Sequence, residues 1–112
     1  MKFIREFKLF LEQFTDRNSI GNWKIFYFHN SSHDINDRII KRTSIKNESD
    51  FNSLLDKIIK KIEDDKLSGD YTFISFNYSI KLIIRIKDFD IKIITALGKN
   101  ENTKKKDKII LL

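Results

Sequence analysis

The hydrophobic pattern changes its period at Gly69, and this change constrains the fold more than any other feature of the chain. Before Gly69 the apolar residues recur every three or four positions, which is typical of amphipathic helices. After it they alternate with polar residues in short runs, which is typical of strands. The sequence therefore predicts an α+β protein whose N-terminal helices pack on one face of an antiparallel β-meander of four to five strands.

Three helices are predicted ahead of Gly69. The first covers residues 1–17, where Phe and Leu side chains fall on one helical face. Residues 34–65 hold the other two, which are joined by a link at 43–47. Asn47 or Ser49 can cap the start of the third helix. Its continuous apolar stripe consists of Phe51, Leu54, Leu55, Ile58, Ile59 and Ile62.

Strands are predicted at residues 23–30 and in four segments of residues 71–112. In 23–30, β-branched and aromatic residues follow one another, so we expect both faces of this strand to be covered. Gly21, just ahead of it, is predicted to take a left-handed turn conformation. A tight turn is expected at Asp88–Asp90, and the whole chain, 1–112, is expected to form one domain.

Composition excludes several kinds of site. The chain has no Cys, which excludes disulfides and thiolate metal sites, and with three Gly in all it lacks a glycine loop for phosphate. We expect no cofactor and no metal, because a strand end and a polar break separate His29 from His33. No apolar run is long enough for a bilayer, and residues 1–14 do not resemble a secretory signal. We therefore expect a cytoplasmic protein without a membrane partner.

The net charge of +6 makes an acidic partner plausible. Lys, Asn, Ile and Phe are abundant and Pro is absent, as expected of an AT-rich coding sequence, so the lysines carry little weight. Arg is rarer, and two arginines lie in the stretch HDINDRIIKRTSI at residues 33–45.

That stretch is the candidate site. If residues 34–42 are helical, Arg38 and Arg42 lie one turn apart and point the same way. With Thr43 and His33 nearby they would suit a phosphate group, because guanidinium groups bind its oxygens and an imidazole moves a proton near neutral pH. The alternative is that the arginines pair with carboxylates of the fold and that His33 caps the helix.

The order His33, Arg38, Arg42-Thr43, then an amphipathic helix and a late strand Ile93–Gly98, resembles a group of small proteins encoded by tailed phages. That group in turn resembles the barnase, EndoU, colicin and RelE-like ribonucleases, in which two helices precede a four-stranded antiparallel sheet. The opening MKFIREFKLFLEQF is similar to the openings of proteins of large tailed phages, some of which are packaged into the capsid.

The resemblance implies a ribonuclease-like or toxin-like protein that binds RNA and cleaves it without a metal ion. The 2′-hydroxyl would attack the phosphate, assisted by a general base, a general acid and a cation. His33 would act as acid or base, and Thr95 would orient the substrate from the sheet. The residues implied to hold phosphate or RNA are Arg38, Arg42, Thr43, Arg85 and Tyr78.

Two alternatives remain open. The first is a non-enzymatic phage protein that docks on a host machine, such as a defence nuclease or polymerase in the host cytoplasm, or a minor virion component. The second is a homodimer that forms through strand edges, because KIILL at residues 108–112 makes an apolar edge without Pro.

Overall fold

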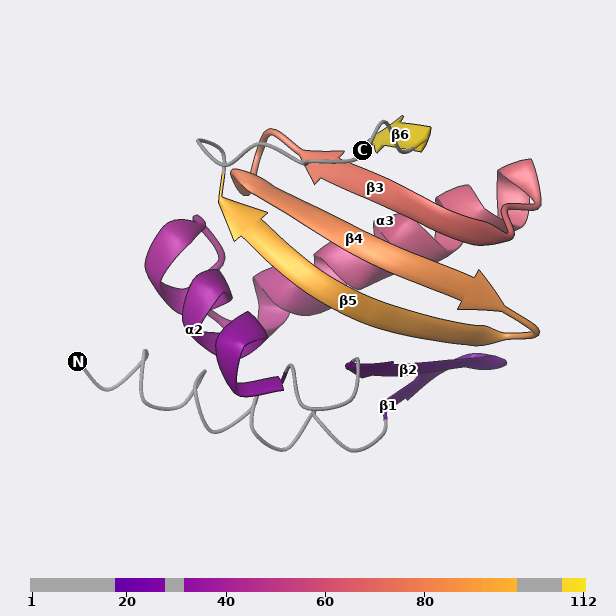
Figure 1. Ribbon diagram of the computed structural model, residues 1–112, viewed down its shortest axis with the longest axis horizontal. Coiled ribbons are helices and arrows are strands. Elements are labelled where there is room, and N and C mark those ends of the chain that lie inside the picture. Colours follow the sequence, from indigo (N-terminus) through magenta and orange to yellow (C-terminus); the bar gives the residue numbers. More distant parts are fainter. Residues whose placement is uncertain (1–17, 28–31, 99–107) are drawn as a thin grey trace.

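The computed structural model describes residues 18–27, 32–98 and 108–112; the helix predicted at 1–17 lies outside this part of the chain. Within it, two helices and one six-stranded sheet form an α+β structure, so the predicted class is confirmed (Figure 1). The strands lie in the order β1-β2-β5-β4-β3-β6. The sheet is mixed, so the prediction of an antiparallel sheet is wrong.

Three strands form the antiparallel centre of the sheet, as predicted. They are β3 (Gly69–Ser75), β4 (Ile80–Lys87) and β5 (Asp90–Gly98). The tight turn between β4 and β5 consists of Asp88 and Phe89, whose φ angles are 48° and 66°. Two positive φ angles in a two-residue loop match the twist of the flanking strands.

The outer strands depart from the predicted meander. β6 (Lys108–Leu111) does not lie beside β5; it pairs in parallel with β3 at the edge of the sheet. β2 (Trp23–Tyr27) pairs in parallel with β5. β1 (Asn18–Ile20), a segment for which no strand was predicted, pairs with β2 across a two-residue loop that begins with Gly21 at φ 59°. Alternation predicts which face a side chain occupies but does not name the neighbouring strand.

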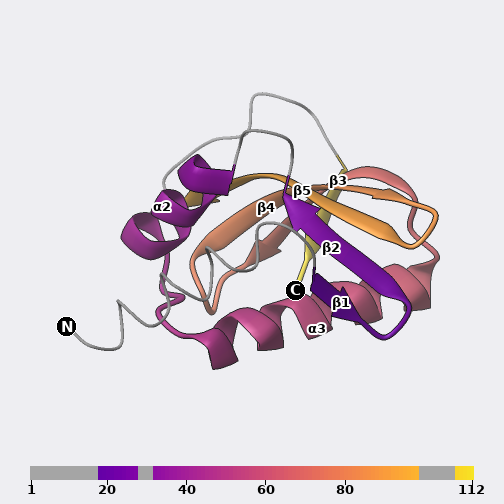
Figure 2. The same cartoon turned by 90° about the horizontal axis from the view of Figure 1, so that it is seen from below.

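α3 (Glu48–Asp65) runs across one face of the sheet (Figure 2). Of the two predicted caps, Asn47 is the one that caps its start, where its side chain accepts a hydrogen bond from the backbone N–H of Asp50. All six residues of the predicted apolar stripe are buried. Their burial contributes on the order of 10 kcal/mol before the conformational entropy is subtracted.

α2 (Ser32–Arg42) lies at the end of the sheet where β5 finishes (Figures 1 and 2). Ile35 and Ile39 are fully buried and anchor it in the same core as α3. A Cβ atom at Gly98 would lie 2.8 Å from the carbonyl oxygen of Arg42. Glycine at this position therefore allows the last turn of α2 to approach the end of β5.

Candidate functional site

The two predicted arginines lie on the outer part of α2. Since α2 is helical throughout Ser32–Arg42, Arg38 and Arg42 stand one turn apart. Arg42 and Lys41 are exposed, and Arg38 is half-buried. Lys41 and Arg42 occupy the last turn, where the helix dipole favours cations, so they also stabilise α2. We call Arg38, Lys41 and Arg42 the α2 basic face.

Thr43 stabilises the end of the helix that carries this face. Its side chain is buried, and its hydroxyl donates to the carbonyl oxygen of Ile39 at 2.6 Å. The same hydroxyl oxygen accepts from the backbone N–H of Ile45 at 3.2 Å. These bonds satisfy backbone groups at the helix end. The structure therefore gives Thr43 a role in holding α2 and gives its hydroxyl no exposed surface for a phosphate contact.

Tyr78 lies at the same end of the sheet as the α2 basic face. It belongs to the turn between β3 and β4, and its carbonyl oxygen accepts from the backbone N–H of Ser44 at 2.8 Å. Its half-buried ring has the Nζ atom of Lys57 at 6.0 Å from its centroid. The β3–β4 turn is thus fixed to the chain immediately after α2.

Arg85 lies toward the other end of the sheet. Ile80 pairs with Gly98 beside α2, and Arg85 follows five residues later on β4, about 16 Å away at 3.3 Å per residue. Its guanidinium donates twice to Asp70, from Nε to Oδ1 at 2.8 Å and from Nη2 to Oδ2 at 3.2 Å. These bonds raise the pKa of Arg85. The structure therefore does not bring Arg85 to the α2 basic face.

Thr95 and His33 complete the predicted set. Thr95 is half-buried and pairs with Ile83 on the sheet face opposite α3. A β-bulge at Ile94 precedes it, because Ile93 pairs with the next residue of β4. His33 occupies the first turn of α2, and its side chain lies outside the described residues. At 100° per residue, position 33 is about 140° around the helix from position 38.

The predicted acid–base and phosphate groups are consequently not assembled at one point by the described residues. The C-terminal end of α2, the β3–β4 turn and Gly98 lie close together. Arg85 instead pairs with Asp70 toward the other end of the sheet, and the side chain of Thr43 is buried. The helical phase of α2 does not carry position 33 to the side of the arginines. This arrangement supports binding better than it supports catalysis.

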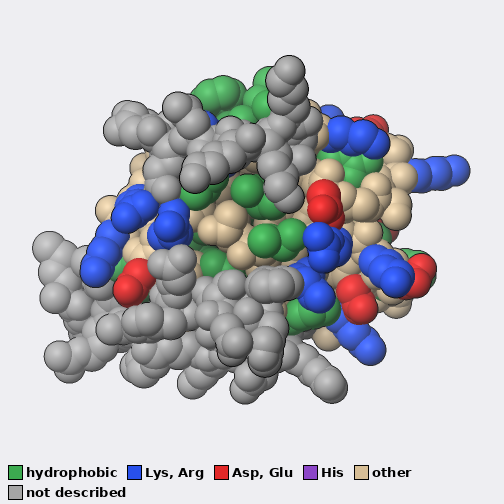
Figure 3. Space-filling view, viewed as in Figure 1, with side chains coloured by type: hydrophobic (Ala, Val, Ile, Leu, Met, Phe, Trp, Pro, Cys, Tyr) green, Lys and Arg blue, Asp and Glu red, His purple; other side chains and the backbone are tan. Residues whose placement is uncertain are grey.

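The sheet face opposite α3, here called the open face, has an apolar band between two basic groups (Figure 3). Lys and Arg side chains gather at the α2 end and again near the β4–β5 hairpin. In the second group the Nζ atom of Lys92 lies 5.4 Å from the ring centroid of Phe26. This group also contains three carboxylates, which reduce its net charge. Its charged residues are Lys24, Arg85, Lys87, Lys92, Asp70, Asp88 and Asp90.

Exposed aromatic side chains are the feature that sequence reasoning missed. Phe76, in the β3–β4 turn, is 73% exposed. Phe89, in the β4–β5 turn, is 57% exposed, and its ring centroid lies 5.2 Å from that of Trp23. Strict alternation placed Phe76 inside a strand. The signal for a turn was the following polar run, since Asn77 and Ser79 are residues that turns favour.

Among the described residues, no three His, Cys, Asp or Glu side chains are grouped so that they could hold a metal ion. No helix in residues 32–98 has the length and apolar character needed to cross a membrane.

Comparison with known proteins adds no relative: no family model, no curated protein and no solved structure matches this chain. The likeness to small tailed-phage proteins and to the ribonuclease class therefore stays a prediction based on short motifs.

Proposed function

We propose that this protein binds single-stranded RNA through the α2 basic face and acts by binding rather than by cleavage. The observation that carries the proposal is the position of Arg38 and Arg42, one turn apart on a helix whose last turn is packed against Gly98. Planar guanidinium groups suit phosphate oxygens, and a net charge of +6 favours association with a polyanion.

The preference for single strands rests on Phe76. The turn that carries this exposed ring is bonded to Ser44, just beyond Arg42, so both lie at the same end of the sheet. Unpaired bases stack on exposed aromatic rings, whereas bases within a duplex are inaccessible to them. Guanidinium groups for the backbone and one ring for a base together favour a flexible, unpaired strand.

The test is a binding titration with a fluorescent single-stranded RNA at several salt concentrations. We expect Arg38→Ala/Arg42→Ala to weaken binding about tenfold or more, since charge-assisted bonds contribute roughly 1.5–3 kcal/mol each. The slope of the logarithm of the binding constant against the logarithm of the salt concentration should become shallower, by an amount that corresponds to about one to two released counterions. The matched control is Lys60→Ala/Lys61→Ala, which removes the same charge from the C-terminal half of α3, the half that is farther along the chain from α2.

Equal weakening by the two double variants would reduce the effect to overall charge and would contradict the assignment to α2. An undetectable complex between the wild-type protein and RNA would end the RNA proposal altogether. The recovered RNA should also stay intact after incubation with the wild type and with His33→Ala. A cleavage product that depends on His33 would restore the nuclease hypothesis.

A second candidate function, docking on a host protein, is favoured by the aromatic pair of Phe89 and Trp23. Phe89 keeps a left-handed backbone, unusual for a bulky residue, while more than half of its surface is exposed. Exposed aromatic residues are common at the centres of protein interfaces.

Phe89→Gly separates this docking role from a role in the fold, because glycine adopts the left-handed conformation without strain. We expect the variant to remain folded, with an unchanged or slightly raised urea midpoint, while it loses a stoichiometric host protein that the wild type captures. Retention of that protein by the variant would exclude the aromatic pair as the docking point.

A further inference from the structure

β6 is an edge strand with exposed apolar side chains. The sheet formed by residues 18–27, 69–98 and 108–111 ends on β6, whose inner edge pairs with β3. No described strand pairs with its outer edge. Ile109 and Leu111 are 56% and 58% exposed. Such edges are templates for further strands unless charge, Pro or a bulge protects them, and β6 contains one charged residue, Lys108, at its start.

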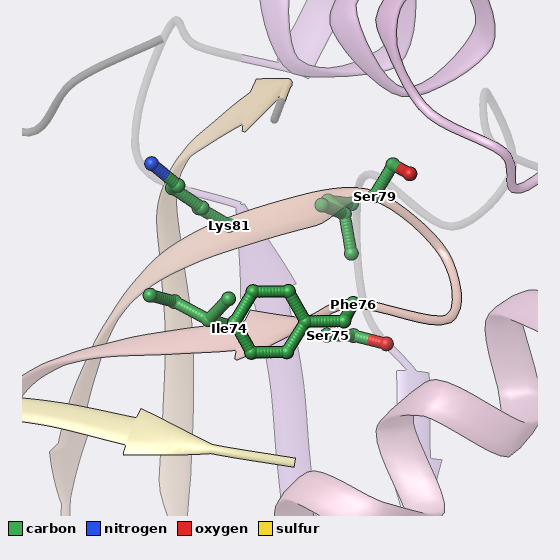
Figure 4. A pocket seen from close by; sticks show the side chains of 6 residues that line it. Ile74, Ser75, Phe76, Ser79 and Lys81 are labelled. Carbon is green, nitrogen blue, oxygen red and sulfur yellow. The ribbon is translucent and has the colours of Figure 1, made fainter. Parts of the chain in front are cut away.

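The side chains of β6 extend an apolar surface of β3. Ile109 and Leu111 pair with Thr72 and Ile74, so all four positions lie on the open face. Phe76 follows Ile74 by two residues, and Figure 4 shows its ring beside the Ile74 side chain, at a pocket of about 360 Å³. Three of the four most exposed large hydrophobic residues that the structure describes thus lie at this corner of the sheet.

We propose that two copies of this chain associate through β6 in an antiparallel pair about a two-fold axis. An edge strand complements a reversed copy of itself, because the outward N–H groups of each strand donate to the outward C=O groups of the other. The axis stands perpendicular to the sheet and keeps both open faces on one side. Two residues that lie opposite each other in the strand pair must therefore point to the same face, so both are odd-numbered or both are even-numbered.

The register centred on Ile110 uses the whole of β6. It places Ile109 opposite the partner's Leu111, and this contact occurs twice because of the symmetry. Lys108 then lies opposite the partner's Leu112, so the two Lys108 side chains stand at opposite ends and do not repel each other. The open-face apolar surfaces of the two copies become continuous.

The dimer should be weak and dependent on concentration. A pair of four-residue edges buries less than the roughly 1,000 Å² expected of a stable interface. We therefore expect dissociation constants in the micromolar range, with a free monomer at low concentration. The inference does not depend on RNA binding, and the test uses nuclease-treated protein so that the two remain separate.

The experiment is sedimentation velocity of the full chain over a roughly hundredfold range of micromolar concentration. The wild type should shift from one chain to two. Ile109→Lys/Leu111→Lys places like charges opposite each other and should weaken the dimer at least tenfold. Ile109→Glu/Leu111→Lys places opposite charges across the pair in the proposed register and should restore it. Both substituted positions are exposed, so the circular dichroism spectrum should stay unchanged.

Each outcome decides the proposal. A wild type that stays monomeric at all concentrations overturns it, as does an assembly that grows beyond two chains. Equal weakening of the dimer by the two double variants overturns the register. In a pair centred on Ile109 or on Leu111, that residue lies opposite its own copy, so both variants place like charges opposite each other. Restoration by the mixed-charge variant alone supports the two-fold pair.

Discussion

At the scale of the single residue, Tyr27 places a titratable hydroxyl in the core of the protein. Its side chain is 5% exposed on β2. Burial raises its pKa above the ordinary value of 10.0, because the phenolate would lose its hydration. The folded protein therefore retains a proton at pH values where the unfolded chain releases it.

This difference predicts a loss of stability in alkali. The contribution of Tyr27 is fully present below pH 10 and declines as the pH rises above 10, because the unfolded state then binds fewer protons. The slope approaches 1.36 kcal/mol per pH unit for one group. Urea unfolding between pH 8 and 11 should show a steeper decline for the wild type than for Tyr27→Phe. Parallel curves for the two proteins would contradict the assignment.

Single residues also show what sequence could predict. The stripe from Phe51 to Ile62 was correctly predicted because helical spacing alone decides which side chains face the sheet. Thr72 lies on the face of β3 opposite Tyr71 and Phe73, and it is nevertheless 1% exposed. Ile83 and Ile109 flank it on the neighbouring strands, and one of these neighbours comes from a pairing that the sequence did not reveal.

At the scale of the element, the cap of α3 makes a separable contribution. The Asn47 side chain accepts from the backbone N–H of Asp50 at 2.8 Å. We expect Asn47→Ala to lower the free energy of unfolding by about 1 kcal/mol, because this N–H group loses its acceptor. Asn47→Asp, the matched control, keeps an acceptor and should change it little. Urea unfolding measures both, and an equal loss in the two variants would contradict the role of the cap.

Most helices and strands could be predicted, because the residues at their ends favour caps and turns. The link after α2, the cap of α3 and the turn at Asp88 all carried local signals. β1 was missed because its three residues, Asn18 to Ile20, are too few to show an alternating pattern. The predicted α2 face was correct in its helical phase, while the hydroxyl of Thr43 was assigned outward although the fold uses it.

At the scale of the whole molecule, the order of the strands in the sheet could not be predicted from the sequence. Alternation assigns faces within a strand, and short turns assign neighbours only where strands are consecutive. The parallel pairs β2–β5 and β3–β6 join segments that are distant along the chain. The separation of Arg85 from the α2 basic face was also beyond the sequence, because it depends on α2 packing at the Gly98 end of the β4–β5 pair.

The β2–β5 pair has a further consequence for how the chain reaches this structure. Residues 24–27 bond to residues 90–93, so the pairing closes a loop that spans most of the described chain. Closing such a loop is slow, whereas α3 and the hairpins of β3, β4 and β5 involve near neighbours. The β1–β2 hairpin, marginal alone, therefore joins late. Until β2 joins, the edge of β5 that it will occupy has unpaired backbone groups. During refolding at high protein concentration, strands of other chains can pair with that edge.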